Sequence, residues 1–399
     1  MKIKDGWIKS KLDKFIEIVM GQSPKSEFYN NQGIGMPFLQ GNRTFGERFP
    51  YFDTYCTQNK KIANKEDIIM SVRAPVGDLN IATQDISIGR GVCALKAKNN
   101  QNQFLYYLLK YNIKNLINKE SGTVFGSVNK NDILGLEIIY PKDIKTQEKI
   151  ASILSAFDDK IEINNEMNKT LEEMAQTLFK RWFIDFDFQN ENGEPYKSSG
   201  GKMVDSELGE IPEGWEVREL KSVLENRKEK INNQKAKVLS AVNTGELKLS
   251  EEYFTKQVFS KDISKYIQVS KYDFAYNPSR INIGSIGIFE EDYIGAVSPI
   301  YVVFRAENTY HWYFKYLIKT SNLRKEINSR AFGSVRQSLS YKDFSLIKVV
   351  YPSQDIISHF NNIYEILYKN QKKLIKEIQF LTEIRDTLLP KLMSGEVEA

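Results

Sequence analysis

Residues 143–188, DIKTQEKIASILSAFDDKIEINNEMNKTLEEMAQTLFKRWFIDFDF, decide the fold, because they read as one long amphipathic helix ending in an aromatic and acidic strip. Apolar and Asn side chains recur there at alternating steps of four and three, the heptad spacing of a seam between two helices. Two unrelated core helices would show similar spacing, so the heptads alone leave both readings open. The predicted seam positions are Phe157, Ile161, Asn164, Asn168, Leu171 and Leu178.

A seam of this kind needs a partner helix, and residues 353–399 supply one about 210 positions later. The same spacing recurs there at Leu367, Gln371, Leu374, Ile378, Leu381 and Leu388. Polar residues inside a seam fix the register of the two helices at some cost in stability. We therefore expect Asn164, Asn168 and Gln371 to specify how the helices align.

Much of the first half of the chain recurs in the second half at offsets of about 206 to 211 residues. The matched segments are Gly6-Trp7 with Gly214-Trp215, residues 67–70 with 273–276, Gly77 with Gly284, residues 125–128 with 332–335, and Tyr140-Pro141 with Tyr351-Pro352. Two copies in one chain most simply pack with pseudo-two-fold symmetry. The predicted class is α+β, with two mixed α/β domains in pseudo-two-fold repeat and two long helices pairing as an antiparallel coiled coil.

The repeat and a change of composition set the predicted boundaries. Residues rich in Gly, Pro, Ser, Asn and Glu after position 188 indicate a linker. The expected organisation is a first mixed domain at 1–143, a central helix at 144–188, a linker at 189–213, a second mixed domain at 214–352 and a C-terminal helix at 353–399.

Composition excludes several classes of protein. The 399 residues are enough for two or three cores, and only two cysteines, Cys56 and Cys93, are present, so no disulfide framework is expected. No leader-like or membrane-spanning apolar run is evident, and we expect a cytoplasmic protein. A net charge of +5 permits a polyanion partner without requiring one.

Motifs for covalent chemistry are incomplete. Gly201-Lys202 is followed by Met203 and has Tyr196 where a phosphate-binding loop needs Gly. Residues 277–279, Asn-Pro-Ser, lack the second Pro and the aromatic residue of an adenine methyltransferase motif. His311 and His359 stand apart from other ligand-type residues, and we interpret both as ordinary surface or packing side chains. The sequence predicts no catalytic residue and no metal site.

Several segments together resemble the type I restriction-modification specificity subunits. They are IASILSAFDDKIE at 150–162, LFKRWFIDF at 178–186, SELGEIPEGW at 206–215, GSVRQSLSYKDF at 333–344 and LLPKLMSGEV at 388–397. The resemblance implies a non-catalytic DNA-binding subunit, with adenine N6 methylation and restriction carried out by partner subunits. It implies two modification subunits, restriction subunits and double-stranded DNA as partners. S-adenosylmethionine, ATP and Mg would belong to the partners, and no cofactor to this chain.

Polar and basic residues in Gly-rich loops are the expected DNA contacts, because backbone and side chain can approach a groove there. In the first domain these are Gln40, Asn42, Arg43, Arg73, Arg90, Ser127, Asn129 and Lys130. In the second they are Asn243, Thr244, Asn277, Arg280, Asn282, Ser334, Arg336 and Gln337. For each, the alternative is a turn-forming Asn or a solvated Arg.

A helix of about 36 residues is roughly 54 Å long, which matches about 16 base pairs of duplex. The resemblance implies recognition of a bipartite DNA site, one half by each domain, with the paired helices setting the spacing, and this helix length also supports such a ruler. The alternative is a stand-alone coiled-coil DNA-binding or anti-restriction protein.

Overall fold

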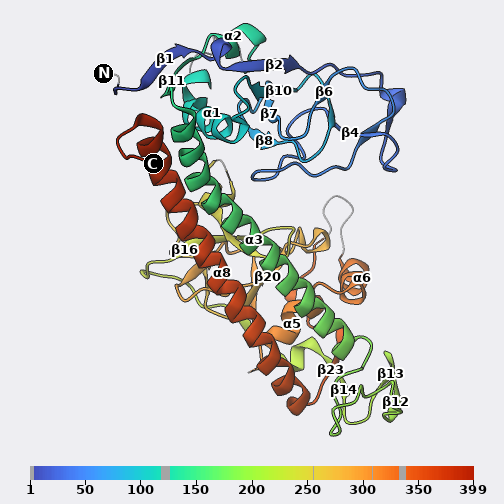
Figure 1. Ribbon diagram of the computed structural model, residues 1–399. Helices are drawn as coiled ribbons and strands as arrows, with labels where there is room; N and C mark the ends of the chain where they lie inside the picture. The colour runs from blue at the N-terminus through green and yellow to red at the C-terminus, as the bar shows by residue number, and fades with distance from the viewer. Residues whose placement is uncertain (1–3, 118–125, 255, 308, 332–337) are drawn as a thin grey trace. The chain divides into compact units, whose positions relative to one another are not determined.

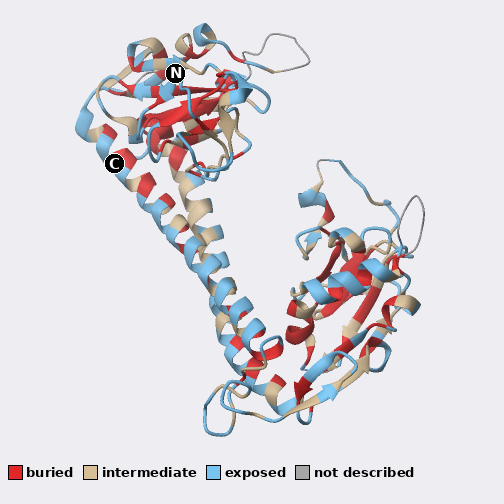
Figure 2. Cartoon of the chain, turned by 90° about the vertical axis from the view of Figure 1, so that its right-hand side faces the viewer, coloured by how far each residue is buried: buried red, intermediate tan, exposed pale blue. Residues whose placement is uncertain are grey.

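The computed structural model describes residues 4–117, 126–254, 256–307, 309–331 and 338–399. The chain forms two compact units, each described by itself below. Unit 1 comprises residues 1–167 and 373–399, and unit 2 comprises residues 168–372. Each unit holds one mixed α/β domain and one half of the helix pair. Figure 2 shows the buried residues concentrated on the strands of each mixed domain and on the facing sides of the helices.

The mixed domain of unit 1 contains three sheets. β1 (Trp7–Lys11) pairs antiparallel with β11 (Glu137–Pro141). A four-stranded antiparallel sheet has the order β2 (Ile16–Met20), β10 (Val92–Ala97), β7 (Ile68–Ser71) and β8 (Leu79–Ile81). A five-stranded sheet has the order β3 (Tyr29–Asn30), β5 (Tyr55–Cys56), β4 (Met36–Leu39), β9 (Ile86–Ile88) and β6 (Ile62–Ala63). Only β4 and β9 among the described strands of unit 1 run parallel.

One long helix completes the core of this domain. α1 (Asn102–Ile117) buries Phe104, Tyr107 and Leu108 among side chains from β7 and β10. These residues recur at helical spacing, so one face of the helix is apolar and packs on the sheet. The shorter elements are η1 (Leu12–Lys14), η2 (Ser26–Phe28) and α2 (Lys130–Leu134).

The mixed domain of unit 2 repeats this topology. β14 (Glu216–Glu219) pairs with β23 (Lys348–Tyr351), and a four-stranded sheet has the order β15 (Leu224–Arg227), β22 (Val302–Ala306), β19 (Asp273–Tyr276) and β20 (Ile286–Ile288). The third sheet has the order β17 (Leu247–Leu249), β16 (Lys237–Ala241), β21 (Gly295–Val297) and β18 (Ile267–Val269). β16 and β21 are parallel, as β4 and β9 are in unit 1.

Helices and short elements of unit 2 surround these sheets. They are η3 (Leu220–Ser222), α4 (Ser250–Tyr253), η4 (Ile281–Ile283), α5 (His311–Leu317), α6 (Ser321–Arg330) and α7 (Tyr341–Phe344). Where unit 1 has the single helix α1, unit 2 has α5 and α6. The break falls at Thr320, whose hydroxyl accepts a hydrogen bond from the Leu323 backbone and caps α6.

Backbone details also repeat between the two domains. Gly77 and Gly284 both adopt left-handed φ angles, of 93° and 89°. Asp67 and Asp273 are both buried at the start of the corresponding strands, and each accepts the backbone N–H three residues earlier. Burial raises the pKa of both carboxyl groups. The internal repeat predicted from the sequence is therefore confirmed at the level of topology and local geometry.

Helices α3 (Ile144–Phe183) and α8 (Gln354–Ser394) lie side by side as an antiparallel pair (Figure 1). In unit 1, Arg385 of α8 donates to Asp158 of α3 at 2.6 Å, and Asp158 also accepts from Tyr107 of α1 at 2.6 Å. In unit 2, Phe179 and Trp182 pack on Phe360 with ring centroids 6.4 and 6.2 Å apart. Unit 1 and unit 2 thus each contain contacts that join the two helices.

The predicted seam residues of α3 and α8 are buried or half-buried in the structure. The predicted end of the central helix was wrong by five residues, because α3 stops at Phe183 and residues 184–188 fold back. Phe186 has a left-handed φ of 63°, and the Phe188 ring stacks on Trp215 with centroids 5.3 Å apart. The expected linker also contains a hairpin of β12 (Met203–Ser206) and β13 (Gly209–Pro212).

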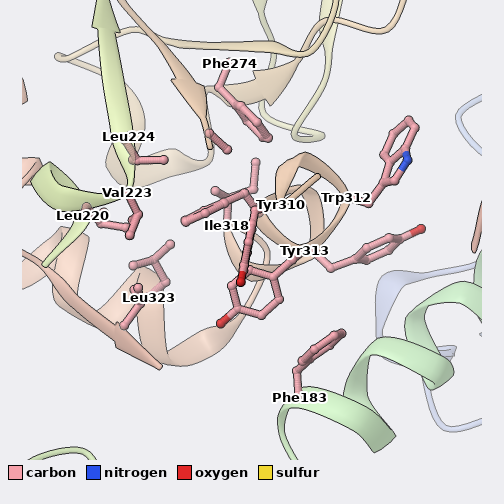
Figure 3. Packing of buried hydrophobic residues seen from close by; sticks show 14 of the residues in the cluster. Phe183, Leu220, Val223, Leu224, Phe274, Tyr310, Trp312, Tyr313, Ile318 and Leu323 are labelled. Atoms are coloured by element: carbon pink, nitrogen blue, oxygen red, sulfur yellow. The ribbon is translucent and has the colours of Figure 1, made fainter. Parts of the chain in front are cut away.

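An aromatic core fixes α3 to the mixed domain within unit 2. Phe183 of α3 points toward Tyr313 of α5, and the two ring centroids are 5.0 Å apart (Figure 3). Tyr316 of α5 donates to Glu172 of α3 at 3.2 Å. Lys315 is buried nearby, pairs with Glu290 at 2.6 Å and lies over the rings of Trp312, Tyr364 and Tyr368. Burying a charge is tolerated only with such partners.

Candidate nucleic-acid interface

Most of the residues predicted to contact DNA in the first domain lie in loops at one end of its sheets. The parallel strands β4 and β9 both end there, so the loops that follow them begin side by side. β7 ends beside the start of β10, where Ser71 pairs with Val92. We name this group of loops, residues 21–23, 40–43, 72–73, 89–91 and 126–129, loop cluster 1.

Backbone hydrogen bonds tie loop cluster 1 together. Gly91 donates to the carbonyl of Gln40, and Val72 donates to that of Gly91, both at 2.9 Å. Val128 donates to Val72 at 3.1 Å, and Arg73 forms an isolated bridge with Ser127. A Cβ added at Gly91 would lie 2.3 Å from the Gln40 carbonyl oxygen, so this close approach requires glycine.

The side chains of loop cluster 1 differ in how they are held. Arg43 pairs with Asp53 at 2.7 Å, and this pairing lowers the pKa of the Asp53 carboxyl to about 2. Asn42 donates to Asp78 at 2.6 Å, and Gln40 accepts from Ser23 at 2.9 Å. These three predicted contacts therefore already have partners within the protein.

Asn129 has a structural role that the sequence analysis did not assign. Its side chain accepts the backbone N–H groups of Asn131 and Asp132, and Asp132 accepts the N–H of Asn129. This is a capping box at the start of α2. Lys130 and Ser127, the neighbouring predicted contacts, are exposed.

Arg73 and Arg90 are the strongest candidates in unit 1. Both are exposed, and neither has an ion pair or a side-chain hydrogen bond among the described residues. Their backbones lie in adjoining loops, because Arg73 follows Val72 and Arg90 precedes Gly91, to which Val72 donates. Two unpaired guanidinium groups on neighbouring loops suit phosphate oxygens or the O6 and N7 atoms of guanine.

The corresponding end of the second mixed domain carries loop cluster 2, residues 242–245, 277–284 and 298–301. The parallel strands β16 and β21 end there, and Tyr276 at the end of β19 pairs with Val302 at the start of β22. The Ser285 hydroxyl donates to the Ala241 carbonyl at 2.5 Å. A Cβ at Gly284 would lie 3.0 Å from the Asn243 carbonyl oxygen, so the two loops touch.

The predicted contacts of unit 2 fall into three groups. Thr244 donates to Glu246 at 3.0 Å, and Asn277 accepts the backbone N–H of Ser279 at 3.1 Å, so both are engaged in their own turns. Asn243 and Arg280 are exposed, while Asn282 is half-buried. Ser334, Arg336 and Gln337 lie outside the described residues.

Two further segments belong to these clusters and were missed. Ser23 donates to Gln40 and accepts the Arg90 backbone N–H at 3.1 Å, although its sequence context showed only a turn. The connection from β21 to β22, residues 298–301, occupies the place that residues 89–91 occupy in unit 1. Its Ile300 is 64% exposed. The internal repeat makes this connection correspond to residues 89–91. Its sequence, Ser-Pro-Ile-Tyr, contains no basic residue that would predict a DNA contact.

We also searched the described residues for metal-binding groups, reactive side chains and membrane-spanning helices. Within the described residues, no group of three or more His, Cys, Asp and Glu side chains is placed to hold a metal ion. His359 is exposed on α8, whereas His311 is packed against Tyr272. Burial raises the pKa of Cys93 to about 12. None of the helices in the described ranges combines the length and apolar character needed to cross a membrane.

Comparison with known proteins identifies the family. Residues 4–173 match the model of the type I restriction modification DNA specificity domain. The MjaIX specificity subunit of Methanocaldococcus jannaschii is 26% identical over 99% of this chain and 94% of its own length. The HindI specificity subunit of Haemophilus influenzae is 26% identical over 85% and 88%. The MjaX specificity subunit of Methanocaldococcus jannaschii is 38% identical, but over only 42% of this chain and 39% of that protein.

The fold is also shared with a solved structure. The crystal structure of the type I restriction-modification S subunit from M. genitalium aligns with a TM-score of 0.62 over 98% of both chains, at 18% identity. Residues 4–173 thus carry a type I restriction modification DNA specificity domain, and nearly the whole chain is similar to a specificity subunit of a type I restriction enzyme.

Proposed function

We propose that this chain directs a type I restriction-modification complex to a split DNA sequence and reads one half with each mixed domain. The repeated topology carries the proposal, because it presents two corresponding loop clusters in one chain. Loop cluster 1 offers the exposed Arg73 and Arg90, and loop cluster 2 offers the exposed Arg280, among close-packed glycine turns. Phosphate contacts would set the position of each domain, and a few side chains would read base edges in a groove.

The proposed recognition domains are residues 1–143 and 214–352, with α3 and α8 setting the spacing between the half-sites. An α3 of 40 residues corresponds to about 60 Å, or roughly 18 base pairs of rise. The same helices are proposed to dock two modification subunits, which methylate adenine N6 from S-adenosylmethionine. Restriction subunits with ATP and Mg would join this assembly, and this chain itself would need no cofactor.

Reciprocal arginine variants test the proposal. Arg73→Ala should relax recognition of the first half-site only, and Arg280→Ala that of the second only. Each loss should be about 1 to 3 kcal/mol if the arginine contacts guanine in bidentate fashion. The measurement is methylome sequencing of cells carrying each variant with its modification subunit, followed by binding to duplexes altered in one half-site.

Each variant is the other's control, because both remove one exposed arginine. Relaxation of the same half-site by both variants would contradict a separate reader in each domain. A uniform loss on all sequences with a shallower salt dependence would make the arginine a phosphate contact. Specific DNA binding by the chain with no dependent methylation would favour the stand-alone alternative.

A further inference from the structure

A basic lobe lies beside loop cluster 2 and is not among the predicted DNA contacts. It consists of residues 228–237, which end at the first residue of β16, and residues 256–266, which precede β18, and we name it the lysine lobe. Its two segments hold seven lysines and two acidic residues, a net formal charge of +5, which equals that of the whole chain. The lysines are Lys228, Lys230, Lys235, Lys237, Lys256, Lys261 and Lys265.

The lobe is a folded feature with its own small core. Ile231 donates to the Tyr266 carbonyl and Asn232 to that of Ser264, both at 2.9 Å, so the two segments lie side by side. Ile231 and Tyr266 are buried, with Phe259 packed against them. The lysines are therefore held by a scaffold.

The charges of the lobe are directed outward and are not neutralised locally. All seven lysines are exposed, and none forms an ion pair with a described residue. Lys237 lies over the Tyr293 ring at 4.7 Å. Of the two acidic residues, Glu229 pairs with Arg227 outside the lobe. Asp262 accepts the Ser264 backbone N–H within the lobe, and the charge of Lys265 helps to lower the pKa of its carboxyl group. Uncompensated like charges repel one another, so a surface of this kind favours an anionic partner.

Strand register places residues 256–266 of the lobe at the same end of the sheet as loop cluster 2, whereas Lys237 pairs with Gly295 at the start of β21. Ile267, the first residue of β18, pairs with Val297, the last residue of β21, and Ser298 of loop cluster 2 follows directly. Lys230 forms a bridge with Ile267. Residues 256–266 and Lys230 therefore lie toward the end of the domain where Asn243 and Arg280 are exposed.

The corresponding segments of unit 1 are much less charged. Residues 21–35 and 57–61 also lie side by side, through a 3.2 Å bond from Thr57 to the Phe28 carbonyl, and Lys61 accepts from Ile88 beside loop cluster 1. They carry three lysines and one acidic residue, a net charge of +2, and Lys25 is paired with Glu27 at 3.6 Å. The segments of unit 1 that correspond to the lobe therefore carry less positive charge than the lobe itself.

We propose that the lysine lobe binds the phosphate backbone of duplex DNA next to the second half-site and contributes affinity without reading bases. The proposal rests on the proposed function, which brings DNA to loop cluster 2. Lysine acts as a point charge toward phosphates, and each neutralised phosphate releases a counterion. The second domain would accordingly depend on salt more steeply than the first.

The test compares two fourfold variants of the full chain in complex with its modification subunit. The lobe variant is Lys228→Gln, Lys230→Gln, Lys261→Gln and Lys265→Gln. The charge-matched control is Lys197→Gln, Lys202→Gln, Lys221→Gln and Lys348→Gln, all exposed residues of unit 2 outside the lobe. Binding is measured from 50 to 300 mM salt on a duplex with the methylome-defined site and on a duplex of scrambled sequence.

The slope of log affinity against log salt should become shallower by about 2 to 4 in the lobe variant, at about 0.9 per lost phosphate contact, and stay unchanged in the control. The ratio of affinities for the two duplexes should be retained. An unchanged slope, or equal changes in both variants, overturns the proposal, as does a loss of modification-subunit binding with DNA affinity intact.

A fourfold Lys→Arg variant at the lobe positions separates charge from folding, because it must keep the wild-type slope. If the Gln variant fails to fold, the pair Lys261→Gln and Lys265→Gln must still lower the slope by about 1 to 2. Failure of the proposed function is a distinct result: the wild-type complex would then bind both duplexes equally, whatever the slopes.

Discussion

At the scale of single residues, His311 links packing in unit 2 to pH. Its ring stacks on Tyr272 with centroids 4.0 Å apart and lies 4.6 Å from the Trp312 ring. Burial lowers the pKa of His311 to about 4, from an ordinary value of 6.5. The folded protein therefore holds a neutral imidazole at pH values where the unfolded chain already binds a proton.

The consequence is a loss of stability on acidification. Above pH 6.5 the imidazole is neutral in both states, and as pH falls toward 4 only the unfolded state gains the proton. Between pH 7 and pH 5 the free energy of unfolding should fall by about 1 to 2 kcal/mol through His311, after allowance for its partial exposure. His311→Phe keeps the ring stack and should remove this part of the pH dependence.

Urea denaturation followed by tryptophan fluorescence measures the effect at both pH values. His359→Gln is the matched control, because it removes the only other histidine, an exposed one on α8. The control should keep the wild-type pH dependence. An equal pH dependence in His311→Phe and wild type would show that His311 is protonated in the folded protein.

Individual residues also show which features of the candidate DNA interface could be predicted from the sequence. The predicted contacts at the glycine turns of the first domain lie in adjoining loops, because close backbone approach leaves a local signal in the sequence. Asn129 and Arg43 look like equally good DNA contacts in the sequence, yet one caps a helix and the other pairs with Asp53. These partners depend on the folded arrangement of the loops, which side-chain type does not reveal.

At the scale of elements, periodicity predicted the two long helices and their seam. It could not predict that α3 ends at Phe183, since residues 184–188 continue the apolar pattern. The chain turns there because the rings of Phe183, Phe186 and Phe188 pack around Trp215, more than twenty-five residues later. The break between α5 and α6 likewise depends on the folded structure, where the Thr320 side chain caps α6.

The polar positions of the seam give an element-scale prediction. Asn164 is fully buried on α3, and neither polar atom of its side chain has a hydrogen-bond partner in the structure. The Asn168 side-chain oxygen is likewise buried without a partner. An unsatisfied buried polar group costs about 1 to 3 kcal/mol, so both residues destabilise the helix pair. Polar seam residues of this type are retained where they fix register.

The double variant Asn164→Leu and Asn168→Leu should raise the free energy of unfolding by about 1 to 3 kcal/mol. It should also permit misaligned or oligomeric forms, because an apolar seam no longer penalises wrong registers. Thermal melting and light scattering measure the two effects. Asn370→Leu on the exposed side of α8 is the control and should change stability by less than about 0.5 kcal/mol.

An unchanged melting temperature together with a single monomeric species would contradict the assignment of these asparagines to the seam. Increased stability without misaligned forms would leave them in the seam but remove their role in register.

At the scale of the whole molecule, the internal repeat was readable because turn glycines and strand starts recur in order along both halves. The difference in surface charge between the two domains could not be predicted from the repeat. The lysine lobe comes from two separate lysine-rich segments, which are joined by the backbone bonds of Ile231 and Asn232 and by a small apolar core. Folding thus brings two clusters of positive charge together on one surface.

The last prediction concerns the proposed role of the helices as a ruler. One heptad is inserted in α3 after Asn168 and another in α8 after Lys372. The antiparallel pairing makes these positions correspond, since Glu172 contacts Gln371 and Lys160 pairs with Glu377. Seven residues restore the same helix face, so the seam should stay in phase. Each helix lengthens by about 10.5 Å, or roughly three base pairs of rise.

The recognised sequence should keep both specific halves and gain about three unspecified bases between them. The second half-site must also turn by about 100° around the duplex, at about 10.5 base pairs per turn. Insertions of five residues at the same two places are the control, because they put the seam out of phase and should abolish assembly. Methylome sequencing of cells carrying the heptad variant decides the outcome. An active variant that methylates sites with the original spacing would show that α3 and α8 do not set the distance between the half-sites.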